Sequence, residues 1–288
     1  MNVRTIDLGQ TNNLQQLIES YWSNGVKTFI LNGTYKVCKD TYTHLKIGKH
    51  LSGITMKGLK AILDGNRTTS HIIIVEDANA TIEDITVTSG NTTNPLKVAD
   101  SYQGSHFRSV YEVVDGAGIL ILGNSKVKLK RCNILNNHSG MCGGGMSNQG
   151  TGSVYVDSCK FENNTSYHTG AAIDNLTNGA QVIVRRSLFS NNLSNTGSIC
   201  GGPHGQITIF SGTKSNIYHN KFYGTTFPID ASNDSHIISF DNMYQNKQVN
   251  PIKPAGAGTL TNKLYHLGHL LTFIILLIRY NTYPWVRH

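Results

Sequence analysis

The fold is decided by residues 143–164, which read GGGMSNQGTGSVYVDSCKFENN, and by two similar segments that flank them. The preceding segment, residues 116–137, reads GAGILILGNSKVKLKRCNILNN, and the following one, residues 170–192, reads GAAIDNLTNGAQVIVRRSLFSNN. Their glycine-rich blocks recur every 27 residues, and a fourth block, GSIC, follows at Gly197. A fixed period of this size is typical of repeat architectures.

Weaker copies of the same pattern extend the repeat in both directions. The upstream copies begin at Ile54 and Ala80, 26 residues apart, and the downstream copies begin at Asn216 and His236. Units of this length are too short for tetratricopeptide or ankyrin repeats, and their glycines would break the helices that those repeats need. The sequence therefore predicts another kind of solenoid.

Hydrophobic residues alternate within each unit. Val154 and Val156 are followed, after a slip of one residue, by Cys159 and Phe161. Alternation with period two predicts a strand with one buried face. Short strands separated by Asn/Gly turns favour an all-β fold, a right-handed parallel β-helix with coils of about 27 residues. Leucine-rich repeats are the structural alternative, but their dense leucine signature is absent.

In a parallel β-helix, equivalent residues of successive coils form columns about 4.8 Å apart. The expected core column is Val87, Ile134, Phe161, Phe189, Phe222 and Met243. A second column alternates in charge and predicts either an ion-pair ladder or a chance arrangement on a solvated face. Its members are Lys57, Glu83, Lys130, Asp157 and Arg185. A third column predicts an amide ladder at a turn and contains Asn137, Asn164 and Asn192.

The cysteines point to no metal or cofactor. Five are present, at Cys38, Cys132, Cys142, Cys159 and Cys200, with no CxxC motif and no Cys/His cluster at zinc spacing. Cys132 and Cys159 occupy the same buried position one coil apart. Their separation would permit a disulfide, although a reduced stack of small apolar thiols is favoured.

The repeat pattern divides the chain into three parts. Residues 1–37 form an N-terminal cap, residues 38–250 form the β-helix repeats, and residues 251–288 form a basic, partly apolar tail. The period breaks between the second and third units, where about twenty extra residues form an inserted loop at 91–115. Long insertions in solenoids lie on one face and often bind ligands.

An amphipathic helix is predicted at the start of the chain. Residues 12–24 (NNLQQLIESYWSN) have apolar residues at helical spacing, Asn12 with Gln15 resembles a capping box, and Gly25 ends the segment. Residues 28–37 (TFILNGTYKV) indicate a strand, a turn and a second strand. Such a helix would cover the open end of a solenoid, which repeat stacks require.

The net charge of +8 belongs mainly to the tail. No acidic residue follows Asp241, whereas five of the 25 basic residues do, which leaves +3 on residues 1–241. The sequence therefore favours no nucleic-acid partner. Within the tail, residues 264–280 combine an apolar run of fifteen residues with a basic flank, and predict membrane contact, an apolar cap on the last coil, or a segment unrelated to this fold.

The glycine blocks and the CKFENN and SLFSNN segments resemble the GGAI and FxxN repeats of polymorphic outer-membrane proteins and related bacterial β-helix adhesins. The resemblance covers residues 116–192 well and residues 54–250 loosely. The N-terminal helix followed by residues 28–37 also resembles the entry to pectin-lyase-like β-helices. This resemblance implies an extracellular, cell-surface or outer-membrane location. No signal peptide is visible, so the protein stays inside the cell or the chain begins downstream of the true N-terminus.

The function that we expect is non-catalytic binding of glycans, or of a host or cell-surface protein, by an adhesin-like surface-associated protein. The inserted loop at 91–115 provides the candidate ligand-binding residues Tyr102, His106, Arg108 and Tyr111. Tyrosine rings stack against sugars, and the arginine and histidine side chains donate hydrogen bonds.

A polysaccharide lyase or glycoside hydrolase of the pectin-lyase-like class is the alternative. It requires Asp157, Asp174, Arg185 and His204 to converge in one groove, with a carboxyl group of perturbed pKa. The sequence has no Asp-Asp pair, and Gly202–Gly205 is the only hint of a hydrolase motif. A third possibility is a repeat scaffold, or a fragment of a longer adhesin, without a ligand of its own.

Overall fold

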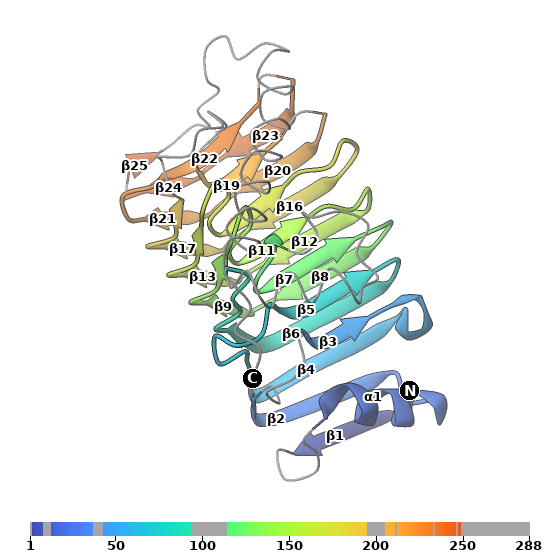
Figure 1. Cartoon of the computed structure of the whole chain (residues 1–288). Helices are drawn as coiled ribbons and strands as arrows, with labels where there is room; N and C mark the ends of the chain where they lie inside the picture. Colours follow the sequence, from blue (N-terminus) through green and yellow to red (C-terminus); the bar gives the residue numbers. More distant parts are fainter. Residues whose placement is uncertain are drawn as a thin grey trace, which may run out of the picture.

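The protein is an all-β stack of parallel sheets with one α-helix at its N-terminal end (Figure 1). The computed structural model describes residues 2–7, 13–36, 43–93, 114–194, 205–210, 212–232, 234–245 and 247–248. Strands from successive units lie side by side along the stack, an arrangement compatible with a β-solenoid.

Three sheets, here named A, B and C, contain the strands. Sheet A has fifteen: β1 (Val3–Asp7), β2 (Thr28–Lys36), β4 (Ile54–Asp64), β6 (Asn79–Thr88), β8 (Lys126–Lys130), β9 (Asn133–Leu135), β12 (Ser153–Asp157), β13 (Lys160–Glu162), β16 (Gln181–Arg185), β17 (Leu188–Ser190), β20 (Lys214–Tyr218), β21 (Lys221–Tyr223), β23 (His236–Phe240), β24 (Met243–Tyr244) and β25 (Lys247–Gln248). Sheet B has seven: β3 (Thr43–Ile47), β5 (His71–Glu76), β7 (Ile119–Leu122), β11 (Met146–Asn148), β15 (Ile173–Asn175), β19 (Gly205–Ile209) and β22 (Phe227–Ala231). Sheet C has three: β10 (His138–Ser139), β14 (Thr165–Ser166) and β18 (Leu193–Ser194).

The register of sheet A follows the sequence repeat. Val127 of β8 pairs with Val154 of β12, which pairs with Val182 of β16, so the predicted period sets the pairing. The fourth glycine block was expected to start the next strand of sheet B, but Ile173 pairs with Ile207 of β19. That prediction is wrong because this coil contains extra residues, which move the strand past the glycine block.

The slip of one residue within each unit is a turn with left-handed backbone. Asp84, Arg131, Ser158, Arg186 and His219 have φ angles between 51° and 58°. One residue in this conformation reverses the pleat, so the alternation restarts with the next apolar side chain again facing the core. The two strands that flank this turn belong to sheet A in every unit from β8 onwards.

A column of stacked rings fills the core. The ring centroids of Phe161 and Phe189 are 5.1 Å apart and those of Phe189 and Phe222 are 4.8 Å apart, with nearly parallel planes. The predicted column is confirmed from Val87 to Phe222 by the strand pairing. Its last member was wrong, because Phe222 pairs with Tyr244 and Met243 lies one position off the column.

Three buried asparagines form the predicted amide ladder. The Asn137 side chain donates to Asn164 Oδ1 at 3.0 Å, and the Asn164 side chain donates to Asn192 Oδ1 at 2.9 Å. The backbone N–H groups of Asn137 and Asn164 donate to the same two oxygens. All three side chains are inaccessible to solvent, so the ladder replaces water for the polar groups at this corner.

Cys132 and Cys159 are buried free thiols, which confirms the reduced stack. The Cys132 backbone N–H donates to Cys159 Sγ at 3.4 Å, and the Cys159 N–H donates to Ser187 Oγ at 3.1 Å. The column continues to Asn220, whose Oδ1 accepts from the Ser187 N–H. Each side chain therefore accepts a hydrogen bond from the preceding coil.

The N-terminal helix α1 (Leu14–Ser23) packs Leu14 and Ile18 into the end of the core. Asn13 is its N-cap and accepts from the Gln16 N–H, so the predicted capping pair was one residue too early. Gln15 instead exchanges two hydrogen bonds with the Lys46 backbone of β3.

The strand that follows the helix is continuous. Residues 28–37 were expected to contain a turn between two strands, but β2 runs through this segment with a register shift between Asn32 and Thr34. The bulge absorbs the glycine, and parallel pairing with β4 continues on both sides of it. Within the described residues, no helix is long and apolar enough to cross a membrane.

Candidate functional site

The candidate ligand-binding residues Tyr102, His106, Arg108 and Tyr111 lie outside the described residues. The same is true of His204 from the alternative catalytic set. The tail segment 264–280, for which membrane contact was predicted, also lies outside them.

The residues on either side of the insertion are held together. The Thr92 hydroxyl donates to the Val114 carbonyl at 2.5 Å, and the Ser139 hydroxyl donates to the same oxygen at 2.9 Å. The Gly140 N–H in turn donates to Thr92 Oγ1. The chain therefore leaves and re-enters the stack at one place, next to β10 of sheet C.

An open groove of about 500 Å³ runs over sheet C beside this point. Its lining residues are Thr93, Ser139, Thr165, Ser166, Tyr167, Leu193 and Ser194. Tyr167 is 45% exposed and Leu193 is 52% exposed, so the groove combines hydroxyl groups with accessible apolar surface. Strand pairing places Thr165 and Leu193 at equivalent positions of neighbouring coils. Hydroxyls repeated along a groove can donate and accept hydrogen bonds with a polar polymer.

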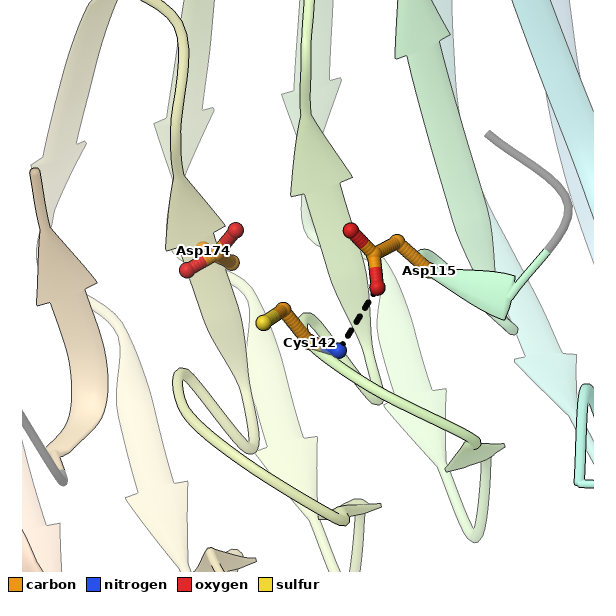
Figure 2. Close-up of side chains that lie close together, drawn as sticks. All are labelled: Asp115, Cys142 and Asp174. Carbon is orange, nitrogen blue, oxygen red and sulfur yellow. Dashed lines mark hydrogen bonds between the residues drawn. The ribbon is translucent and has the colours of Figure 1, made fainter. Parts of the chain in front are cut away.

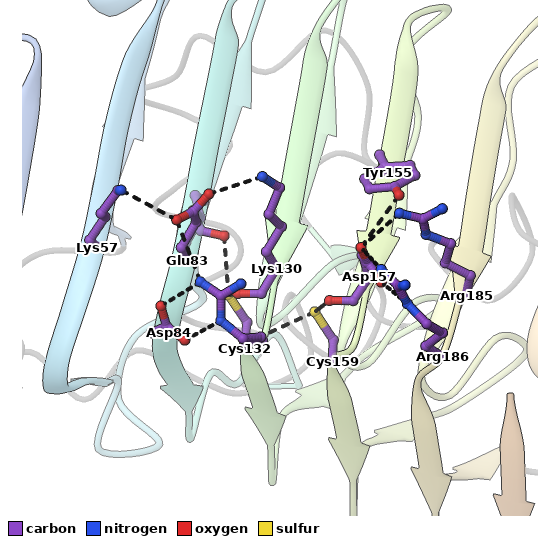
Figure 3. A network of polar contacts seen from close by, with 12 residues as sticks. Lys57, Glu83, Asp84, Lys130, Cys132, Tyr155, Asp157, Cys159, Arg185 and Arg186 are labelled. Atoms are coloured by element: carbon purple, nitrogen blue, oxygen red, sulfur yellow. Dashed lines mark hydrogen bonds and ion pairs between the residues drawn. The ribbon is translucent and has the colours of Figure 1, made fainter. Parts of the chain in front are cut away.

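The predicted charge column forms an ion-pair ladder on the outer face of sheet A (Figure 3). Glu83 lies 3.6 Å from the Lys57 ammonium and 3.2 Å from that of Lys130. One position along, the Arg131 guanidinium donates two hydrogen bonds to Asp84, at 2.7 and 2.8 Å. These contacts link three successive coils.

Asp157 continues the ladder toward the C-terminal end (Figure 3). Its carboxylate accepts from Arg186 at 2.9 and 2.6 Å, from Arg185 at 3.1 Å and from the Ser158 hydroxyl at 3.1 Å. Burial acts to raise the pKa of Asp157, but the hydrogen bonds from Arg186 and Arg185 hold this pKa well below its usual range. The Arg185 guanidinium also stacks over the Tyr155 ring. Asp157 is therefore an ionised structural carboxylate and a poor general acid.

The structure does not bring the alternative catalytic set together within the described residues. Asp157 and Arg185 are ion-paired on sheet A, whereas Asp174 lies on β15 of sheet B and is buried. Glycoside hydrolysis needs two carboxyl groups that flank one bond of the substrate. A pair divided between two sheets, with one member already bound by two arginines, does not have this geometry.

A second group of titratable side chains, which the sequence analysis did not single out, is buried under sheet B. It contains Asp115, Cys142 and Asp174 (Figure 2). The ligand atoms of the three residues lie within 4.8 Å of one another, and none is more than 1% exposed. The available signal was that Asp115 and Cys142 stand immediately before two glycine blocks, 27 residues apart.

The glycine blocks explain why this group is buried. Gly143 and Gly170 have φ angles of 65° and 59°, and a Cβ at either would clash with Ser147 or Asp174, the residue four positions later. The chain thus turns back over the outward-facing side chains of sheet B. Alternation alone would leave those side chains in solvent.

The environment of the group is strongly desolvating. Burial raises the pKa of Asp115 to about 8, against hydrogen bonds from the Cys142 N–H and the Gln149 side chain. Burial, together with the nearby Asp115, raises the pKa of Asp174 well above its usual range. These carboxyl groups favour a proton or a bound cation over the bare charge.

The chain matches no family model, no curated protein and no solved structure with which it was compared. The likeness to the repeats of polymorphic outer-membrane proteins thus rests on the residues of the glycine and asparagine segments. Any function must be argued from the geometry of this molecule.

Proposed function

We propose that the chain is a right-handed parallel β-helix that binds a glycan along its side without catalysing a reaction. The hand follows from the general rule that crossovers between parallel strands of one sheet are right-handed in nearly all proteins. The resemblance to polymorphic outer-membrane proteins and pectin-lyase-like β-helices supports the same fold and a cell-surface location.

The observation that carries the proposal is the hydroxyl-lined groove over sheet C. Serine and threonine side chains from three coils provide donors and acceptors at a spacing of about 4.8 Å, and a sugar polymer presents hydroxyls of the same kind. Tyr167 and Leu193 offer apolar surface for the ring faces of sugars. The groove has no charged lining residue among those described, which favours a neutral glycan over an acidic one.

The position of the groove links it to the insertion. Thr93 lines the groove and is the last residue described before the insertion, and Thr92 is hydrogen-bonded to Val114 on its far side. The expected ligand-binding loop therefore begins at the rim of the groove. A long loop beside a rigid groove is a common arrangement for binding sites.

Absence of catalysis is supported by the state of the described carboxylates. Asp157 is held ionised by two arginines, and Asp174 is inaccessible to a substrate. A glycoside hydrolase needs an accessible protonated acid opposite a second carboxylate.

A glycan array probed with the full chain tests the proposal. We expect binding to neutral glycans that weakens about tenfold in Leu193→Ala and in Tyr167→Ala, because each removes apolar contact in the groove. Leu59→Ala is the matched control, since Leu59 is 57% exposed on β4, outside the groove residues. Binding that survives both groove substitutions, or no glycan binding by the wild-type chain, would refute the proposal. Deleting residues 94–113 then tests the loop separately.

A further inference from the structure

The group of Asp115, Cys142 and Asp174 has the composition of a metal site rather than that of an ordinary core. One thiol and two carboxyl groups, from three different places in the repeat, bring their ligand atoms within 4.8 Å of one another with almost no exposure to solvent. Figure 2 shows the Asp115 and Asp174 carboxyl groups on either side of the Cys142 sulfur. Cores of repeat proteins gain nothing from such groups unless something binds them.

A separate observation points to a missing ligand. Neither carboxylate oxygen of Asp174 has a hydrogen bond of good geometry within the described residues, although the hydroxyls of Ser147 and Thr169 lie close enough to lower its pKa. The Ser147 hydroxyl and the Thr208 hydroxyl are likewise buried without a hydrogen-bond partner. Ser147 and Thr208 are the register neighbours of Asp174 on the two adjoining strands.

These orphaned oxygens all belong to one outward-facing column of sheet B. Ser147, Asp174 and Thr208 are consecutive members of this column, on β11, β15 and β19. Buried polar atoms in native proteins nearly always have a partner, so three adjacent exceptions call for an explanation. A cation that accepts oxygen ligands would satisfy Asp174 and the Ser147 hydroxyl together.

Asp115 is already oriented for ligation. One carboxylate oxygen accepts from the Cys142 N–H at 2.7 Å and the other accepts from the Gln149 side chain at 2.7 Å. Each oxygen keeps a second lone pair, and hydrogen bonds of this kind fix the direction of metal-binding carboxylates in known sites. The Thr169 hydroxyl donates to the Cys142 sulfur at 3.3 Å and positions the third ligand in the same way.

We propose that Asp115, Cys142 and Asp174 bind one zinc ion, with the Ser147 hydroxyl or a water molecule as the fourth ligand. Zinc is preferred to magnesium and calcium because a thiolate is a soft ligand and the two harder ions need six or more oxygens. Tetrahedral zinc places its ligand atoms roughly 3.3–3.7 Å apart, so side-chain rotations of about 1 Å would close the site. The ion would tie three successive coils together under sheet B.

Sequence spacing gave no sign of this site because its ligands do not lie close together in the chain. Asp115 and Cys142 occupy the same repeat position on neighbouring coils, whereas Asp174 follows the third glycine block. Familiar zinc motifs place two ligands within a few residues of each other. In a stack of coils, residues 27 positions apart become neighbours instead.

Metal content after folding is the direct test. The site is buried, so the full chain is refolded under reducing conditions with zinc chloride, passed through a desalting column, and analysed by inductively coupled plasma mass spectrometry. We expect about one zinc ion per chain. Cys142→Ser and Asp174→Asn should reduce the content at least tenfold. Cys159→Ser is the matched control and should retain the zinc, because Ser187 occupies the same column position in the next coil.

A spectroscopic measurement on the wild-type chain keeps the test independent of how the variants fold. Refolding with cobalt(II) in place of zinc should give the charge-transfer absorption of a cobalt–thiolate bond and the visible bands of tetrahedral cobalt. A wild-type chain that retains less than about a tenth of an ion, or cobalt-loaded protein without the thiolate band, would overturn the proposal. Equal loss of zinc from Cys159→Ser would overturn it as well. Glycan binding can fail without affecting any of these results.

Discussion

Replacing Asn164 with alanine should lower the free energy of unfolding by about 4 kcal/mol. The Asn164 side chain makes four hydrogen bonds: its Oδ1 accepts two from Asn137, and its Nδ2 donates to Ile134 O at 2.8 Å and to Asn192 Oδ1 at 2.9 Å. A buried hydrogen bond contributes roughly 1 kcal/mol net, and more when its partner is left without a substitute. The neighbouring amides are themselves inaccessible to water, so none of the four bonds is replaced.

Equilibrium urea unfolding followed by circular dichroism measures this effect. Asn133→Ala is the control, because Asn133 is exposed and makes one side-chain bond, of 3.3 Å, to Thr86. Its expected cost is within about 0.5 kcal/mol of zero. Asn164→Asp should be at least as destabilising as alanine, because it sets a second acceptor against Ile134 O and Asn192 Oδ1. A cost for Asn164→Ala within 1 kcal/mol of the Asn133→Ala control would show that the ladder does not stabilise the stack.

Three further perturbations test other parts of the architecture. Lys60 is exposed with a φ angle of 58°, so Lys60→Gly should raise the melting temperature by relieving roughly 0.5–1 kcal/mol of backbone strain, while Lys128→Gly in the extended strand β8 should lower it. Phe189→Ala should cost about 3–5 kcal/mol in urea unfolding, because the ring is buried between two others, and a loss below about 1.5 kcal/mol would contradict the stacked core. The pKa of Asp157 is lowered in the folded chain by Arg186, so its ion pairs stabilise the protein above about pH 4 and this contribution is lost as the pH falls further; Asp157→Asn should flatten the stability profile between about pH 4 and pH 2, and an unchanged profile would refute the assignment.

The sequence predicted those parts of the fold that depend on periodicity alone. A constant spacing of 27 residues converts directly into strand register, as at Val127 and Val154, and the slip within each unit marks the left-handed turn at Ser158. Prediction failed where the coil length changes. Ile207 and Tyr244 occupy positions that arithmetic assigned elsewhere, because insertions shift the register without leaving a mark in the hydrophobic pattern.

The candidate sites were harder to predict for a different reason. Alternation says which side chains point away from the core, and it placed Asp157 correctly on an accessible face. The same rule would place Asp174 in solvent, although Gly170 turns the chain back over it. Burial of an outward-facing residue depends on the path of the loops, which hydrophobic periodicity does not encode.

The polar columns also show why a buried site should occur where a column changes its residue type. In the amide ladder each coil repeats the same side chain, so every donor meets an acceptor from the next coil and the column satisfies itself. The column that contains Ser147, Asp174 and Thr208 has no such repeat, and its buried oxygens lack partners among the described residues. Unsatisfied polar groups are costly in a low-dielectric interior, whereas apolar residues would fill the same space without that cost. Since sequence, turn chemistry and packing agree elsewhere in the stack, the disagreement at this column is where a bound ligand best explains the residues present.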